Sequence, residues 1–256
     1  MKLDRRYVEK PWGRSTLPRI FDPPAVQRIG EVWFTGAGDQ PLLVKYLFTS
    51  ERLSIQVHPD DEQARARGLP RGKTECWYIL EAEPAAELGL GLARQASREE
   101  LRAAALDGSI ERLMHWRPVR AGDFFYVPPG TIHAIGGGIS LLEFQQNSDV
   151  TYRLYDYGRP RELHLDDGVA VANCRPYPDA LAQHVSTTET RTLVDGPQFT
   201  FICTSSDALQ DRRRWVIPLY GEARSGGELA RAGECLLVEA GECVEGDARM
   251  LIGATA

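Results

Sequence analysis

The chain has few cysteines, and they are not arranged in pairs. Its 256 residues include five cysteines, an odd number with no CxxC spacing. A disulfide scaffold or a CxxC zinc or redox motif is therefore excluded as the organising feature. A reducing compartment is favoured, with each cysteine acting as a small apolar residue.

Long apolar runs and a positive net charge are also missing. No stretch approaches the roughly 18 apolar residues of a membrane span, and Met1–Arg6 lacks the apolar core of a signal peptide. The formal net charge is −6 and the sequence pI is about 5.5. These features predict a cytoplasmic protein that binds neither nucleic acid nor a membrane nonspecifically.

Short segments rich in β-branched and aromatic residues dominate what is present. They are bounded by Gly, Pro and Asp, which is typical of a mainly β barrel or sandwich. The clearest predicted strands are Leu42–Phe48, Leu53–His58, Glu75–Leu80, Asp123–Val127 and Ile139–Phe144.

One helical insert interrupts these strands, at about residues 94–116. Ser97 and Glu100 form a capping-box pattern, and the apolar residues that follow have helical spacing up to Gly108. A second short helix is expected around Ile110, and a further helix is expected to begin near Asp166.

An internal echo predicts two similar β units. Arg120–Gly130 and Arg231–Gly241 both read Arg-Ala-Gly, an acidic residue, an apolar strand, two further residues and Gly. The first copy continues to His133, whereas the second has no histidine. We therefore expect an N-terminal metal-binding domain at 1–180 and a C-terminal degenerate unit at 181–256. Arg175–Pro178 and Ser186–Thr190 mark the expected linker.

Three separate segments carry residues that suit one metal ion. Gln56 and His58 are two apart, so they point to the same face of a strand. Glu75 opens an apolar strand, where an unpaired carboxylate would be costly, and His133 follows a Pro-Pro-Gly turn. Two nitrogen and two oxygen ligands favour Zn²⁺, with Mn²⁺, Fe²⁺ and Co²⁺ as alternatives.

Polar residues near these segments suit an anionic substrate. Ser54 shares the strand face of Gln56, and Lys73 lies two residues before Glu75, where it could hold an anion or move a proton. In the stretch 149–159, Arg153 and Arg159 occur among three tyrosines. That composition suits a phosphorylated sugar, because arginine binds phosphate in a bidentate fork. His115, His164 and His184 are interpreted as structural or solvated.

At these residues the chain resembles the type I mannose-6-phosphate isomerases, in their short bacterial form. The matching stretches, which extend over about residues 5–175, are Glu9–Gly13, Gly30–Trp33, Leu53–Asp61, Gly72–Ile79, Tyr126–Gly136 and Glu143–Arg153.

The resemblance implies a double cupin β-barrel with one Zn²⁺ per chain in the N-terminal barrel. The metal ligands that it implies are Gln56, His58, Glu75 and His133. It places Ser54, Lys73 and Arg153 in the substrate pocket, with Lys73 and Arg153 as catalytic residues. The implied reaction interconverts mannose 6-phosphate and fructose 6-phosphate, in a monomer or a homodimer.

The proton-transfer base and the substrate remain open. Lys73, Asp60 and Glu143 are all candidates for a base that moves a proton between C1 and C2 through an enediol. The alternatives are another cupin enzyme, such as an epimerase or an isomerase of a different sugar phosphate, and a non-catalytic sugar-phosphate sensor. An oxygenase fits less well, because its iron site would use two His and one carboxylate without Gln56.

Overall fold

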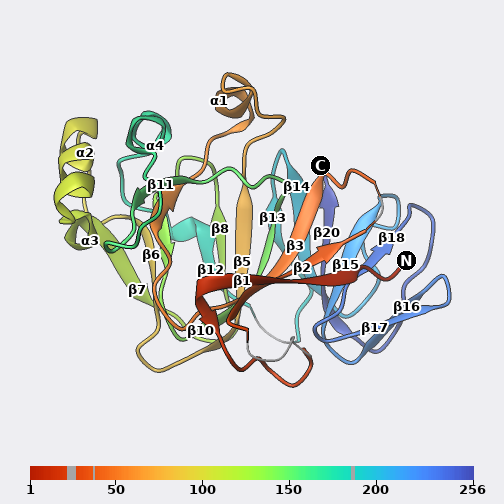
Figure 1. The fold of residues 1–256 in the computed structure, drawn as a ribbon. Coiled ribbons are helices and arrows are strands. Elements are labelled where there is room, and N and C mark those ends of the chain that lie inside the picture. Colours follow the sequence, from red (N-terminus) through yellow and green to blue (C-terminus); the bar gives the residue numbers. More distant parts are fainter. Residues whose placement is uncertain (22–26, 37, 186–187) are drawn as a thin grey trace. The chain divides into compact units, whose positions relative to one another are not determined.

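The chain forms two compact units built mainly from β-strands (Figure 1). The structure, a computed structural model, describes residues 1–21, 27–36, 38–185 and 188–256. Unit 1 comprises Met1–Phe48, Leu142–Phe144 and His184–Ala256, and unit 2 comprises Thr49–Leu141 and Gln145–Gln183. Residues 1–48 therefore group with the C-terminal residues, which differs from the sequence-based division at 180/181. The assignment of 1–180 and 181–256 to two barrels stays a prediction.

In unit 1, every described strand pairing is antiparallel. β1, β2 and β3 pair in that order, and a second sheet has the order β13-β14-β20-β15-β18, beside a small sheet β17-β16-β19. The strands are β1 (Asp4–Arg14), β2 (Ile29–Thr35), β3 (Leu42–Phe48), β13 (Arg191–Asp195), β14 (Phe199–Thr204), β15 (Arg214–Tyr220), β16 (Glu222–Ser225), β17 (Glu228–Arg231), β18 (Leu236–Val238), β19 (Glu245–Gly246) and β20 (Arg249–Thr255).

Unit 2 holds the α-helices of the described chain and a five-stranded sheet of order β11-β4-β9-β6-β7. Its elements are β4 (Ile55–Val57), α1 (Asp61–Arg65), β5 (Glu75–Ala82), β6 (Glu87–Leu92), α2 (Arg98–Asp107), α3 (Ile110–Leu113), β7 (Met114–Pro118), β8 (Asp123–Val127), β9 (His133–Ile135), β11 (Tyr152–Tyr155), α4 (Leu165–Val171) and the 3-10 helix η1 (Asp179–Leu181). Strands β10 (Ile139–Gln146) and β12 (Ala182–His184) have residues in both units.

The predicted mainly β fold is confirmed, and so are the five predicted strands, with small shifts of their ends. The helical insert is also present, but Met114 already begins strand β7, so the helices end earlier than expected. Ser97 caps α2 by accepting a bond from the Glu100 amide at 3.1 Å. The Glu100 carboxylate pairs with Arg94 instead of completing the capping box.

The helices cover an apolar cluster on one side of the five-stranded sheet. Leu101 and Ala105 of α2 and Val169 of α4 pack with Ile55 and Leu154 from β4 and β11. An ion pair of 2.6 Å joins Arg102 of α2 to Asp166, near the start of α4. The other face of the sheet is therefore left for the polar residues described below.

The two echoed segments adopt the same turn. Gly122 and Gly233 both have positive φ, 88° and 80°, and each precedes an acidic residue whose carboxylate accepts the amide of the arginine three residues earlier. The strands that follow are β8 and β18. The sequence echo is therefore a local structural likeness as well.

Two further expectations bear on the class of protein. None of the five cysteines forms a disulfide bond in the described structure. Arg175–Pro178 is not an open linker, because Tyr177 is buried and donates its hydroxyl to the carbonyls of Tyr126 and Leu181 at 2.7 and 2.9 Å. The run at Ser186–Thr190 lies partly outside the described residues.

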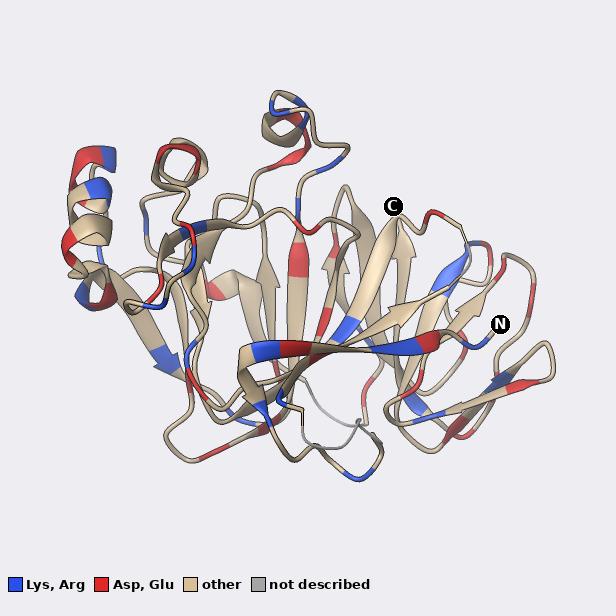
Figure 2. Cartoon of the chain, in the orientation of Figure 1, with Lys and Arg blue, Asp and Glu red and all other residues tan. Residues whose placement is uncertain are grey.

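Acidic and basic residues are interspersed along the chain (Figure 2). Among the described residues, each helix is too short or too polar to cross a bilayer.

Candidate metal centre

Three neighbouring strands of unit 2 bring candidate residues into one row. In the antiparallel register, Arg153 of β11 lies opposite Gln56 of β4, and Gln56 lies opposite His133 of β9. Directly opposed residues project to the same face of a sheet. His58 follows β4 immediately, two residues after Gln56, so it adds a second imidazole on the same face.

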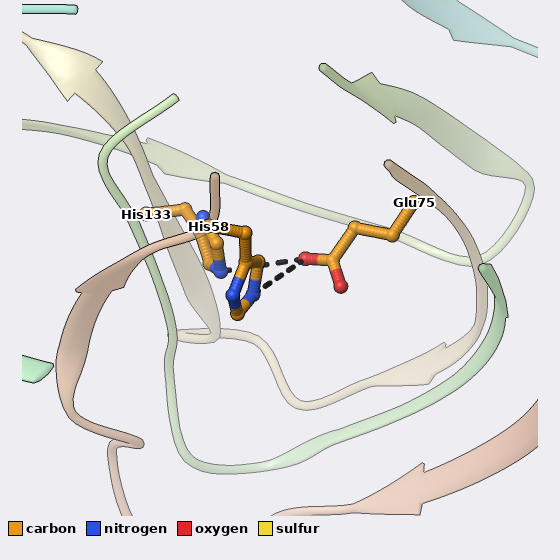
Figure 3. A group of neighbouring side chains, drawn as sticks. All are labelled: His58, Glu75 and His133. Atoms are coloured by element: carbon orange, nitrogen blue, oxygen red, sulfur yellow. Dashed lines mark ion pairs between the residues drawn. The ribbon is translucent and has the colours of Figure 1, made fainter. Parts of the chain in front are cut away.

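A carboxylate from another strand meets this row. Glu75 is the first residue of β5, which pairs with β8. Its Oε1 lies 3.6 Å from His58 Nε2 and 3.3 Å from His133 Nε2. Figure 3 shows both imidazoles facing this carboxylate. All three side chains are at most 2% exposed. The possible ligand atoms of this group, chosen one from each residue, lie within 4.8 Å of one another.

The two imidazoles are held in the neutral form that binds metals. Burial first, then the nearby Lys73 ammonium, lowers the pKa of His58 to about 3, and burial also lowers the pKa of His133. His133 Nδ1 lies 2.9 Å from the carbonyl oxygen of Thr131. Because a carbonyl can only accept, Nδ1 carries the proton and Nε2 is left as an acceptor.

The carboxylate of Glu75 is held in its charged form. Burial alone would raise its pKa, but the adjacent Lys73 ammonium brings the pKa of Glu75 below its usual value. Lys73 Nζ lies 3.3 Å from Glu75 Oε2 and 3.3 Å from His58 Nε2. Lys73 is itself buried, so this is a cation and an anion paired away from water.

The donor set fits a divalent metal ion. Neither carboxylate oxygen of Glu75 has a hydrogen-bond partner among the described residues, and the same holds for Nδ1 of His58. Ligands about 2.1 Å from a tetrahedral ion lie about 3.4 Å from each other. The separations of 3.3 and 3.6 Å around Glu75 Oε1 match that spacing.

Gln56 and Ser54 adjoin this group. Gln56 Nε2 lies 3.2 Å from His133 Nε2, and Gln56 Oε1 accepts a bond from Ser54 Oγ at 3.0 Å. Turning the amide by 180° would direct its oxygen at the histidine and its nitrogen at the serine. Either end of the amide can therefore face His133, and only the oxygen end could bind a metal.

Arg153 is anchored by the segment before α4. Its main-chain N–H donates to His164 Nδ1 at 3.3 Å, His164 N–H donates to its carbonyl at 2.8 Å, and Nη1 donates to the Glu162 carbonyl at 2.8 Å. Its Nε is buried without a hydrogen-bond partner among the described residues. His164, interpreted from sequence as structural or solvated, therefore contacts a candidate site residue.

The candidate bases occupy different environments. Asp60 is the N-cap of α1, where Oδ1 accepts the Gln63 amide at 2.8 Å in a full capping box. Glu143 belongs to unit 1 and pairs with Lys45 at 3.4 Å. Of the three candidates, Lys73 is the one that contacts the His58–Glu75–His133 group.

Sequence reasoning missed the carbonyl of Thr131, which orients His133. A main-chain group carries no signal in the residue types, so only the turn between Pro128 and His133 could have pointed to it. The resulting carbonyl–histidine pair is the usual second layer around a metal-binding histidine.

Comparisons with known proteins agree with the resemblance inferred from the sequence. The mannose-6-phosphate isomerase of Streptococcus mutans is 45% identical over 168 residues, which are 62% of this chain and 53% of that protein. The isomerase of Bacillus subtilis is 44% identical over 174 residues, or 64% of this chain and 55% of the relative. The chain thus spans about half the length of these relatives. No family model matches it.

Solved structures agree over nearly the whole chain. The crystal structure of the mannose 6-phosphate isomerase from Bacillus subtilis superposes with a TM-score of 0.81 at 28% identity, covering 98% of each chain. A phosphomannose isomerase from Salmonella typhimurium superposes with a TM-score of 0.72 at 16% identity, covering 99% of this chain and 98% of that chain, and shows the shared fold alone. The resemblance is therefore confirmed in sequence and in fold.

Proposed function

We propose that this chain is a metal-dependent aldose–ketose isomerase that interconverts mannose 6-phosphate and fructose 6-phosphate. The observation that carries the proposal is the buried His58–Glu75–His133 group, with Lys73 Nζ 3.3 Å from the Glu75 carboxylate. A fold shared with the Bacillus subtilis mannose 6-phosphate isomerase over 98% of the chain supports the choice of substrate.

His58, Glu75 and His133 would hold one Zn²⁺ per chain, with the amide oxygen of Gln56 as the fourth ligand. When bound, the ion would polarise the sugar oxygens and stabilise the negative charge that develops on them. Ser54 would then fix the amide of Gln56, because the serine hydroxyl can accept from the turned amide nitrogen as readily as it now donates.

Lys73 is proposed to carry the proton between C1 and C2. Its ammonium is buried and lies 3.3 Å from both His58 Nε2 and Glu75 Oε2. A lysine side chain can donate or accept a proton in general acid–base catalysis. Asp60 is a weaker candidate, since its carboxylate is used in capping α1.

Arg153 is proposed to bind the negative charge of the substrate, either on the phosphate or on the enediolate. It lies opposite Gln56 in the strand register, and its guanidinium presents a planar set of donors suited to oxyanions. Lys73 and Ser54 complete the proposed substrate contacts. We further propose that the protein works in the cytoplasm, as a monomer or a homodimer.

A coupled assay tests the proposed substrate. Purified protein loaded with Zn²⁺ is given mannose 6-phosphate, and fructose 6-phosphate is followed by its conversion to glucose 6-phosphate and the reduction of a nicotinamide cofactor. Turnover of mannose 6-phosphate above that of the same reaction mixture without the protein supports the proposal. Absence of turnover from protein that carries one Zn²⁺ per chain would instead favour a different sugar phosphate or a sensor.

A further inference from the structure

Gln146, at the end of β10, bonds to the residue that separates two of the proposed site residues. Its side-chain Oε1 accepts the main-chain N–H of Thr74 at 2.9 Å, and its main-chain N–H donates to the Thr74 carbonyl at 3.0 Å. Thr74 is fully buried and lies between Lys73 and Glu75. A single residue therefore satisfies both main-chain polar groups at the centre of the Lys73–Glu75 segment.

The other end of the same amide reaches the segment that carries His58. Gln146 Nε2 donates to Asp61 Oδ1 at 2.9 Å, and the same oxygen accepts the Gly72 N–H at 2.8 Å. Asp61 opens α1, three residues after His58. The amide of Gln146 thus bridges the two chain segments that supply His58 and Glu75.

Close packing makes this bridge sensitive to small movements. Lys73 N–H donates to the Pro59 carbonyl at 3.1 Å. A Cβ added at Gly72 would lie 2.5 Å from the Pro59 carbonyl oxygen and 2.5 Å from the Asp60 carbonyl carbon, well inside van der Waals contact. The two segments therefore touch through their backbones, and a shift of one displaces the other.

We propose that Gln146 is a positioning residue for the metal and proton-transfer groups. By fixing Thr74 and Asp61 at once, it sets the distance of the Glu75 carboxylate and the Lys73 ammonium from His58. The amide suits both partners, because it presents an acceptor to the Thr74 N–H and a donor to Asp61 on one side chain. The inference about Lys73 rests on the proposed function, whereas the inference about Glu75 needs only a metal site.

Metal affinity tests the proposal without any sugar. Gln146→Leu keeps the approximate volume but loses both side-chain bonds. We expect its affinity for Zn²⁺, measured by competition with a chromogenic chelator, to fall about tenfold or more, the usual effect of removing an outer partner of a metal ligand. The visible absorption of bound Co²⁺, which reports ligand geometry, should change as well.

Gln145→Leu is the matched control. Gln145 is fully buried in the same strand and donates to the carbonyls of Gln146 and Ser148, at 2.6 and 2.8 Å, not to Thr74 or Asp61. It should lose thermal stability by an amount similar to Gln146→Leu while its Zn²⁺ affinity changes less than about twofold. Equal affinity losses in the two variants would show a merely structural role and overturn the proposal.

A second variant decides the matter if Gln146→Leu does not fold. Gln146→Glu keeps the acceptor for Thr74 but sets a carboxylate against Asp61, so the affinity for Zn²⁺ should fall. Adding Asp61→Asn removes the repulsion and should recover part of the loss. An unchanged affinity in Gln146→Glu would contradict the proposal.

The two proposals can fail separately. Suppose that neither the wild-type protein nor any variant converts mannose 6-phosphate, but Gln146→Leu still binds Zn²⁺ more weakly than the wild type. The proposed function then fails and the positioning role stands. If wild-type protein is active and Gln146→Leu matches it in Zn²⁺ affinity, Co²⁺ absorption and kcat, the positioning role fails alone.

Discussion

At the scale of single residues, one carboxylate oxygen lies close to both histidines of the His58–Glu75–His133 group. Glu75 Oε1 faces the Nε2 atoms of both His58 and His133, and its other oxygen faces Lys73. A buried carboxylate with no hydrogen bond is costly by itself. Its surroundings, a cation and two neutral imidazoles, are those that a metal ion would complete.

Substitution of His133 tests the ligand assignment. His133→Ala should abolish both Zn²⁺ binding at one ion per chain and the proposed activity, because one of two imidazole ligands is removed. Metal content by atomic emission and the coupled assay measure the two effects. His184→Ala, at an exposed histidine, is the control and should retain both. Activity persisting in metal-free His133→Ala would contradict the ligand assignment.

Substitution of Lys73 tests the assigned proton carrier. Lys73→Met preserves the length of the apolar stem but removes the amine, so kcat should fall by about 10²–10⁴-fold, the usual contribution of a general acid or base. Exchange of the substrate C2 hydrogen with deuterium from solvent, followed by NMR, should slow equally. A variant that exchanges this hydrogen at the wild-type rate would transfer the base assignment to another group.

The sequence predicted these site residues unequally well. His58, Glu75 and His133 were recognisable because charged or titratable side chains in apolar strands are costly without a partner. Asp60 was a candidate base from its place after His58-Pro59, yet its carboxylate caps a helix. Gln146 could not be recognised as a bridge, because its importance lies in main-chain atoms of Thr74 that no residue type reveals.

At the scale of elements, short strands position the site and the helices cover the opposite side of the sheet. Segments rich in β-branched and aromatic residues, bounded by Gly, Pro and Asp, were sufficient to locate the five predicted strands but not the others. The ends of the helical insert were less certain, because Met114–Trp116 has an apolar pattern that suits either a helix or strand β7. These residues form a strand because they pair with β6, and the local sequence does not show which strands pair.

The end of α2 offers a test of these local rules. Gly108 ends the helix with φ +79°, and a Cβ there would lie 3.0 Å from Tyr155 Oη. Gly108→Ala should lower the free energy of unfolding by about 1–2 kcal/mol from the left-handed backbone alone, with a further cost from the tyrosine. Urea unfolding followed by circular dichroism measures the change.

Gly158→Ala is the matched control for that experiment. Its φ is also positive, +77°, but nothing lies within 4 Å of an added Cβ. It should show the backbone cost without the contact with Tyr155. If Gly108→Ala were no more destabilising than Gly158→Ala, the packing of Tyr155 against the end of α2 would be contradicted.

At the scale of the whole molecule, metal binding and folding should be coupled. The proposed ligands lie in or directly after β4 and at the first residues of β5 and β9, which the chain brings together only when unit 2 is folded. A ligand that binds only the folded state stabilises it by RT ln(1 + [L]/Kd), or about 2.7 kcal/mol at a hundredfold excess over Kd. Thermal unfolding with and without Zn²⁺ should therefore show an upward shift, which His133→Ala lacks. An equal shift in His133→Ala would show that the ion binds elsewhere.

The division into units could not be read from the sequence alone. The echo of Arg120–Gly130 in Arg231–Gly241 correctly identified two segments with the same turn. It did not reveal that residues 1–48 group with the C-terminal residues. Such long-range grouping depends on which strands pair, and β1, β2 and β3 carry no local signal of their distant neighbours.

The most direct test of the account is the conversion of mannose 6-phosphate by protein before chelation, after removal of its metal, and after return of Zn²⁺. The account predicts fructose 6-phosphate from the untreated protein, loss of turnover in the metal-free protein, and recovery when one Zn²⁺ per chain is restored. Undiminished turnover in protein shown to be metal-free would contradict it.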